Sequence, residues 1–498
     1  MGKIARRTFL AGGSLLAGMG IGRWFLQPTS DPGPAFPSVD SFDVAKGRIL
    51  NDASGLEPTP INRHVLINAD VDVAFIHRVR ALVIESREKK MPMIASTARH
   101  SMGAHSIPRD GIALTLSQTA IQADPEKKTY RVAAGTRWST VVAELDKIGF
   151  SPAVMQSNND FGVASTFSVN AHGWPTPFAG CGATVRSFRM MVPDGTIQTC
   201  SREKNSELFY HAMGGYGLFG IILDLELDMV PNARLVPRFD VMPATEMGTF
   251  FAETLKNDPS VQMAYGRLDV SLDHFFEEGL LVTYRPTEDQ TNLPPASGPG
   301  IVSHASRVIF RNQVESDLAK HVRWWTETVL GPRFLDETTR NTLINEPVIT
   351  LDDRDPARTD ILHEYFVAPD RFHEFIKACQ EVIPASYQQL LNVTVRYVDA
   401  DNESVLAYAP EPRIASVLLF SQEMTARAEA DMARMTRELI ERVLAIGGSY
   451  YLPYRPHATL DQFRRAYPKA ADFARFKREV DKNLIFRNQF WERYLAKV

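Results

Sequence analysis

Apolar residues along the first half of the chain repeat with helical and strand periods in turn. Within 71–89 they recur at helical spacing, and this segment runs into a short apolar strand at Met91–Ile94. Further segments are read as strands (111–118 and 128–136), a helix closed by Gly149 (138–148), a hairpin around Pro193-Asp194-Gly195 (188–200) and a glycine-rich turn feeding a buried strand (214–231). This half therefore mixes helices and strands.

The second half continues the mixture. A Pro-, Gly- and Ser-rich loop occupies 287–300, and a helix from Asp370 places Cys379 on its apolar face. The strand 390–398 alternates, so that Thr394 and Arg396 share one face, and a long helix is expected over 423–446 with its apolar stripe starting at Met424. The fold class expected from these patterns is α+β.

Length and composition narrow the class of protein. A chain of 498 residues is long enough for two or three folding units. With 55 basic and 59 acidic residues interleaved along it, the chain lacks the basic stripe typical of nucleic-acid binding, so no nucleic-acid partner is expected. Cys181, Cys200 and Cys379 are too scattered for a disulfide framework, and one bridge at most could form.

The N-terminus differs from the rest. Residues 1–30 carry Arg6-Arg7 before a glycine-diluted apolar segment of about 13 residues, too short to span a bilayer. This resembles a twin-arginine export signal, which implies the twin-arginine export machinery as a partner, a periplasmic or envelope location and a folded cargo with a cofactor. Residues 8–26 could remain as a membrane anchor. The alternative is an amphipathic cytoplasmic helix. Residues 31–56 are expected to form a linker.

Three turns made of small residues could cradle a phosphate-bearing cofactor. They occupy 97–104, 156–173 and 214–222, and each adjoins an expected strand. Small side chains leave backbone N–H groups open to a pyrophosphate. None of the three has the glycine spacing of a Rossmann or Walker motif.

The motifs "TARHSMGAHS", "SVNAHG" and "GGYGLFGIILDLEL" together resemble the vanillyl-alcohol oxidase and p-cresol methylhydroxylase (PCMH) superfamily, nearest to its alditol and aldonolactone oxidases. The resemblance implies a two-part PCMH-type FAD-binding domain plus an α+β substrate (cap) domain. The expected parts are 57–234 for the FAD-binding domain, 235–446 for the cap, and 447–498 for a C-terminal segment returning to the FAD-binding domain. The expected cofactor-binding residues are His100, Ala98, Arg99, Ser101, Met102, Gly103, Ser157, Asn158, Ala164, Ser165, Thr166, Ser168, Val169, His172, Gly173, Gly217, Gly220 and Ile222.

The resemblance further implies that FAD is attached covalently through His100. A neutral imidazole is a nucleophile, so a turn that holds it against the flavin edge could let it add there. Members of the superfamily that resemble berberine bridge enzyme attach flavin a second time, through a cysteine in the second turn. Here that turn contains no cysteine, so a single attachment is expected. The alternatives are a non-covalent role for His100, or a metal site formed with His105 and His172, although no suitable carboxylate or cysteine lies at usable spacing.

The expected reaction is oxidation of a small-molecule alcohol, a sugar, polyol or lactone, with oxygen or an electron carrier as acceptor. Arg396 matches an arginine of alditol oxidase, and His457 and Tyr454 lie near basic residues of relatives, although Leu460 replaces a lysine there. Arg396, His457 and Tyr454 are thus the expected catalytic residues; the alternatives are a surface arginine, a structural histidine and a packing tyrosine. Other readings of the whole protein are an envelope flavoenzyme acting on a prenyl-linked sugar, a non-catalytic flavin-binding module, and a metalloprotein.

Overall fold

The computed structural model describes residues 49–298, 310–348 and 355–498. The expected export signal, 1–30, lies outside these residues, as does most of the expected linker. The linker was expected to reach residue 56, but the described chain is already folded at Ile49–Leu50 (β1), which pairs with Thr59–Pro60 (β2). Asp52 between them is buried. Residues 49–56 therefore belong to the folded protein.

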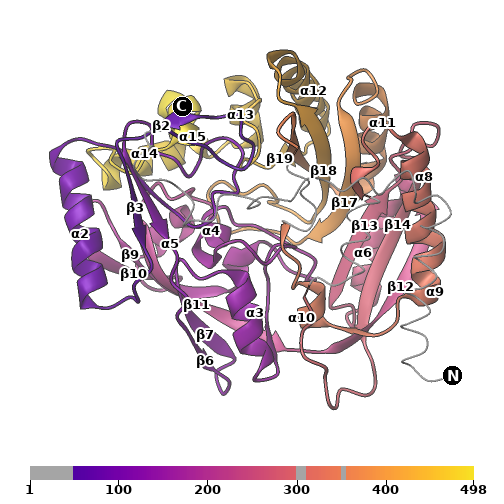
Figure 1. Ribbon diagram of the computed structural model, residues 1–498, viewed down its shortest axis with the longest axis horizontal. Coiled ribbons are helices and arrows are strands. Elements are labelled where there is room, and N and C mark those ends of the chain that lie inside the picture. Colours follow the sequence, from indigo (N-terminus) through magenta and orange to yellow (C-terminus); the bar gives the residue numbers. More distant parts are fainter. Residues whose placement is uncertain (1–48, 299–309, 349–354) are drawn as a thin grey trace.

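Besides the β1-β2 pair, the N-terminal part contains two larger sheets, drawn in indigo to magenta in Figure 1. A parallel three-stranded sheet has the order β3-β5-β4, and a second sheet has the order β10-β9-β11-β7-β6, with β8 paired to β11. All five residues of β5 are buried, as is typical of a central parallel strand. The elements are β3 (Arg63–Ile67), α2 (Val73–Glu88), β4 (Met93–Ser96), β5 (Ile112–Leu116), β6 (Ile121–Asp124), β7 (Thr129–Ala133), α3 (Trp138–Asp146), β8 (Phe150–Pro152), α4 (Val163–Ser168), β9 (Val185–Met191), β10 (Ile197–Ser201), α5 (Ser206–Ala212) and β11 (Ile221–Pro231).

The central part is built on one eight-stranded sheet of order β15-β12-β14-β13-β17-β18-β16-β19. Its strands are β12 (Arg234–Pro243), β13 (Met263–Leu268), β14 (Glu278–Pro286), β15 (Thr338–Thr339), β16 (Arg358–Val367), β17 (Gln389–Val398), β18 (Arg413–Glu423) and β19 (Ser449–Tyr450). Its main helices are α6 (Met247–Asn257), α8 (Asp317–Trp325), α9 (Gly331–Phe334), α10 (Arg340–Leu343), α11 (Phe372–Val382) and α12 (Ala426–Ala445).

Helix α12 covers part of this sheet with the apolar stripe expected from the sequence. Met432, Met435 and Leu439 are fully buried. The helix begins at Ala426, three residues later than expected, because β18 continues to Glu423 and Thr425 caps the helix by accepting from the Ala428 N–H. Met424 therefore lies outside the helix and is 38% exposed, which corrects its expected place in the stripe.

The C-terminal segment lies against the N-terminal part. After β19 it forms α13 (Leu460–Ala466), α14 (Ala470–Val480) and α15 (Gln489–Arg493), which lie beside β2 in Figure 1. The Met93 N–H donates to the Ile485 carbonyl (2.7 Å), and Asn488 Nδ2 donates to the carbonyls of His105 (2.6 Å) and Tyr216 (3.1 Å). The segment thus holds two of the three small-residue turns. Within the described ranges, no helix combines the length and apolarity needed to cross a bilayer.

Candidate active site

A cavity of about 700 Å³ lies between the N-terminal part and the eight-stranded sheet of the central part, called the cap sheet below. Its N-terminal wall is formed by the three small-residue turns, and its cap wall by side chains of β13, β16, β17 and β18. Volumes of 300–1,000 Å³ are typical of cofactor and ligand sites. The following sequence-predicted residues line it: Ala98, Arg99, His100, Ser101, Met102, Ser157, Asn158, Ala164, Ser165, Thr166, Ser168, Val169, His172, Gly217, Gly220, Ile222, Arg396 and Tyr454.

Three of the sequence-predicted residues are not among those that line the cavity: Gly103, Gly173 and His457. Both glycines are required by close packing instead. A Cβ at Gly103 would lie 2.6 Å from His105 Cε1, and one at Gly173 would lie 1.9 Å from the Met155 carbonyl oxygen. A side chain at either position would clash with atoms behind the cavity wall. Glycine is therefore required there by packing and not by contact with a cofactor.

The first turn is held open by buried contacts on its outer side. Arg99 adopts a positive φ of 54° and donates from Nη1 to Thr115 Oγ1 (3.0 Å). Asp52 accepts from the Ala104 N–H at 2.6 Å, and the Ala53 N–H donates to the Arg99 carbonyl. Asp52 was not predicted from the sequence, because it lies within the expected linker, 31–56. The turn is thus shaped by a segment that precedes it by almost fifty residues.

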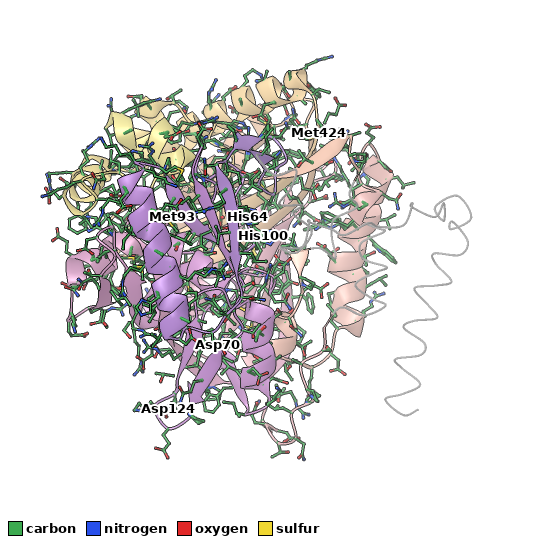
Figure 2. The ribbon with its side chains drawn as sticks, turned by 60° about the vertical axis from the view of Figure 1, so that its left-hand side comes forward. His64, Asp70, Met93, His100, Asp124 and Met424 are labelled. Atoms are coloured by element: carbon green, nitrogen blue, oxygen red, sulfur yellow. The ribbon has the colours of Figure 1, made fainter. Side chains whose placement is uncertain are left out.

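His100 lines the cavity, and Figure 2 labels it near the middle of the view. Its side chain is 9% exposed, its ring lies 4.3 Å from that of Phe161, and its Nε2 is 4.0 Å from Asp160 Oδ2. Burial lowers the pKa of His100, against the opposing effect of Asp160. The imidazole is therefore neutral at neutral pH, which is the form that can act as a nucleophile.

The second and third turns direct small side chains into the cavity and are tightly packed on the side away from it. Gly162 precedes α4, and a Cβ there would lie 2.6 Å from Thr97 of the first turn, so these two turns touch. Trp138 Nε1 donates to Thr166 Oγ1 (2.8 Å), which fixes α4 from behind. In the third turn Gly217 has a φ of 72°, a conformation that favours glycine.

These features fit FAD. Ala98, Ser101, Ala164, Ser165 and Gly217 are all small cavity residues on three turns that converge, which leaves room for a flat ring system and a pyrophosphate. The one imidazole of the first turn that was expected to carry flavin is buried and faces the same space. When bound, FAD would be held by these turns and by His100, and it would supply a hydride acceptor.

On the cap side, Arg396 bridges the two parts of the protein. As the strand pattern predicts, Thr394 and Arg396 on β17 both face the cavity. Arg396 Nη2 donates to Ser157 Oγ of the second turn (2.8 Å), while its buried Nε has no hydrogen-bond partner among the described residues. A guanidinium therefore stands in the cavity wall with a donor unused.

Tyr454 and a buried acid stand next to each other in the same wall. Burial, reinforced by a hydrogen bond with Glu364, raises the pKa of Tyr454 well above its ordinary range, so its hydroxyl stays protonated. Glu364 Oε1 also lies 2.6 Å from His172 Nε2, and both side chains are buried. The sequence analysis missed Glu364. The usable signal was a glutamate within the apolar run "ILHEYFV", since an acid in a buried strand is rare.

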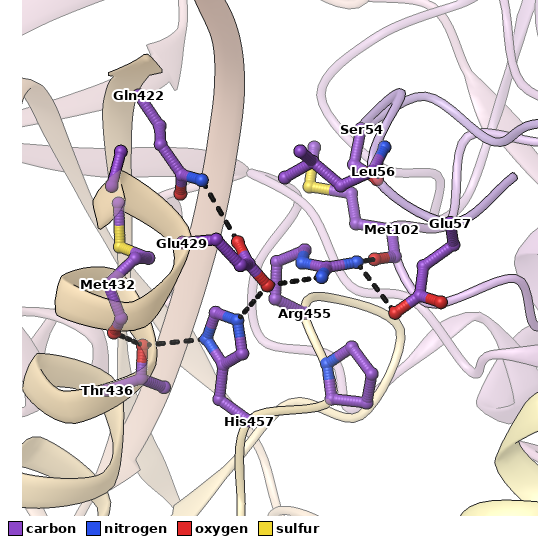
Figure 3. Close-up of polar contacts among 12 residues, drawn as sticks. Ser54, Leu56, Glu57, Met102, Gln422, Glu429, Met432, Thr436, Arg455 and His457 are labelled. Carbon is purple, nitrogen blue, oxygen red and sulfur yellow. Dashed lines mark hydrogen bonds and ion pairs between the residues drawn. The ribbon is translucent and has the colours of Figure 1, made fainter. Parts of the chain in front are cut away.

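His457, expected to be catalytic, instead belongs to a polar network behind the wall (Figure 3). Its Nε2 lies 2.9 Å from Glu429 Oε1 and its Nδ1 3.1 Å from Thr436 Oγ1, both on α12. Glu429 also pairs with Arg455, which donates to the Met102 carbonyl of the first turn (2.9 Å). Burial disfavours ionisation of Glu429, but His457 and Arg455 together lower its pKa to about 2. His457 thus connects the cap to the first turn.

Neither a thiol nor a metal cluster accompanies the cavity in the described part of the chain. Cys181, Cys200 and Cys379 are free and buried, and burial raises the pKa of Cys181 to about 12. Among the described residues, the group of carboxylates and histidine close enough to share an ion is Asp273, Asp317 and His321, which does not line the cavity. His100, His105 and His172 are not part of such a group.

Comparisons with known proteins bear on the same region. Residues 70–201 match the family model described as FAD binding domain. The chain is 29% identical over 189 residues to the mitochondrial L-galactono-1,4-lactone dehydrogenase of Arabidopsis thaliana, covering 38% of this chain and 31% of that protein. It is 24% identical over 226 residues to cytokinin dehydrogenase 1 of the same plant, covering 42% and 38%. The matches thus span only about a third of these relatives' length.

The fold itself is similar over almost the whole chain to a solved structure. The crystal structure of 6-hydroxy-D-nicotine oxidase from Arthrobacter nicotinovorans superimposes with a TM-score of 0.61, covering 90% of this chain and 95% of that one at 13% identity. The α+β fold with a PCMH-type FAD-binding domain is therefore confirmed. The chain thus carries a region similar to the FAD binding domain, residues 70–201, within a fold similar to that of 6-hydroxy-D-nicotine oxidase.

Proposed function

We propose that the protein oxidises a CH–OH group of a sugar, polyol or lactone, using FAD bound covalently through His100. The observation that carries the proposal is the shared cavity, in which a buried neutral His100 on one wall faces Arg396 and Tyr454 on the other. The named substrate of a relative, L-galactono-1,4-lactone, is a polyhydroxylated molecule of this class. When bound, FAD supplies the acceptor for hydride from the C–H carbon.

The residues of this chain would bind and orient the alcohol. Arg396 has an unused Nε donor and a second donor held by Ser157, so it can bind a hydroxyl oxygen while staying fixed in place. Asn392 and Thr394 lie on the same strand face and add polar groups for further hydroxyls. Val417, Leu419 and Leu362 add apolar surface between these polar groups, which favours exclusion of water there.

The covalent link is supported by the position and protonation of His100. A buried imidazole with a lowered pKa is neutral, and Phe161 restricts its ring from one side. Asp160 lies within 4.0 Å of Nε2 and can stabilise charge that develops on the ring as it forms a bond.

The experiment mixes purified protein with single substrates in the absence of oxygen and follows loss of the visible flavin absorbance. The panel contains polyols, aldoses and aldonolactones, with primary and secondary amines as the contrasting class, because relatives with other substrates share this fold. Fast bleaching by one or more alcohols supports the proposal. Bleaching by amines alone would contradict the CH–OH assignment.

A further inference from the structure

Strand β16 presents a line of side chains to the cavity, and the last of them is a carboxylate. Arg358, Asp360, Leu362 and Glu364 of this strand line the cavity, as does Thr359 near its start, whereas His363 faces α12 and contacts Thr436. The sheet register places Glu364 opposite Val417, Val417 opposite Thr394, and Thr394 opposite Arg267. Glu364 thus begins a row that crosses four strands along the cavity wall.

Two neutral donors hold the Glu364 carboxylate. Burial lowers the pKa of His172, against the effect of Glu364, so its imidazole is neutral and donates from Nε2 at 2.6 Å. Tyr454, with its raised pKa, donates its hydroxyl to the same group. The charged group that faces this cluster is Arg396, whose charge lowers the pKa of both His172 and Tyr454. Tyr408 and Tyr451 pack around the cluster as neutral phenols.

Two other acids of the cavity wall have partners that occupy them. Asp52 accepts from the Ala104 N–H and from Ser54, and it thereby shapes the first turn. Asp360 pairs with Arg311. Glu364 alone among these three shares the wall with Arg396 and Tyr454, beside the turn that carries His172.

From this geometry we infer that Glu364 is the proton acceptor for the substrate hydroxyl and that His172 is its positioning residue. The inference rests on the proposed function. As the alcohol is oxidised, its O–H bond breaks and the proton passes to the Glu364 carboxylate. The C–H bond breaks with its electron pair leaving as hydride to the bound FAD, and the O–H electron pair forms the second bond of the carbonyl. Arg396 binds the oxygen during this change.

The test compares wild type with Glu364→Gln, which keeps the size of the side chain and an oxygen for His172. We expect the rate of flavin reduction by the best alcohol of the panel to fall by about 10²- to 10⁴-fold, the range for a positioned base. Flavin content and the rise in melting temperature caused by that alcohol should remain, because neither needs proton transfer. In Glu364→Ala, added formate or acetate should restore part of the rate.

Glu429→Gln is the matched control, since Glu429 also pairs with a buried histidine but does not line the cavity. It should lower the melting temperature while the reduction rate survives and formate or acetate has no effect. His172→Gln should slow reduction less than Glu364→Gln and should be insensitive to formate.

Two results would overturn the inference alone: wild-type reduction rates in Glu364→Gln, or a rate loss matched by equal loss of flavin and of the alcohol-induced thermal shift. If no alcohol reduces wild type, the proposed function fails first and the inference fails with it.

Discussion

The side chain of Arg396 reaches from the cap sheet to the second small-residue turn. It donates to Ser157 and keeps Nε free among the described residues, which is the arrangement expected of a group that binds an incoming oxygen. Arg396→Ala should lower kcat/KM for a good alcohol by about 10²-fold, the scale for loss of one positioned electrostatic group, while flavin stays bound. Steady-state kinetics would check this, with Arg285→Ala, a surface arginine paired to Asp258, as the control. Equal kinetics in both variants would remove Arg396 from the site.

His457 and Glu429 illustrate the opposite case, a pair whose role is to stabilise the fold. The pKa of Glu429 is lowered from its ordinary value of 4.5 to about 2, so its ionised form adds stability above about pH 4.5, and this is lost as the pH falls towards 2. The shift corresponds to about 3 kcal/mol, and solvent screening of this partly exposed carboxylate makes its contribution smaller. Glu429→Gln should therefore unfold more easily at pH 6 but show a flatter dependence of unfolding free energy between pH 5 and 3, measured by urea titration. An unchanged slope over that range would contradict the role.

At this scale, the sequence was informative for some residues and not for others. Small residues around His100 signalled a cofactor turn because that signal is local. An acid within an apolar run marks Glu364 locally, but its place in one row with Arg267 depends on the register of strands far apart in the sequence, which no local pattern reveals. His457 was expected at the cavity because it lies near basic residues of relatives, yet the chain between Tyr454 and His457 is irregular and turns the histidine towards α12.

Among the elements, the segment 49–56 has the largest effect for its size. Proline- and serine-rich composition predicted a linker up to residue 56, but Asp52 within it is buried and binds the first turn through Ala104. The elements with clear periodicity were predicted well: α2 and β17 within two residues of both bounds, and α11 within two residues of its start. Composition thus misleads where a short segment is stabilised by tertiary contacts alone.

Asp52→Ala should destabilise the first turn. Losing hydrogen bonds to a buried charged group is expected to lower the free energy of unfolding by about 2–4 kcal/mol and to reduce the fraction of protein carrying flavin. Denaturant unfolding and the flavin-to-protein absorbance ratio would check this. Asp72→Ala, which removes the cap of α2 away from the cavity, should cost about 1 kcal/mol with full flavin content. Full flavin loading in Asp52→Ala would show that the turn does not need the segment.

For the whole molecule, we propose export through the twin-arginine pathway, which carries folded proteins and suits a cofactor enclosed between two parts of one chain. The basis is Arg6-Arg7 ahead of a glycine-diluted apolar segment. Replacing both arginines with lysine should leave the protein in the cytoplasm, with its flavin, when cells are fractionated. Undiminished delivery to the envelope would contradict the export route.

The flavin bound in the cavity between the two parts of the protein can be measured directly. Wild type, His100→Ala and His105→Ala are purified, their absorption spectra recorded, and each is precipitated with acid. The account predicts a flavin spectrum for wild type and His105→Ala with yellow pellets, and a colourless His100→Ala pellet whose supernatant carries any flavin still bound. A colourless wild-type pellet under a yellow supernatant would contradict the covalent link through His100, and absence of flavin from both fractions of folded wild type would contradict the account as a whole.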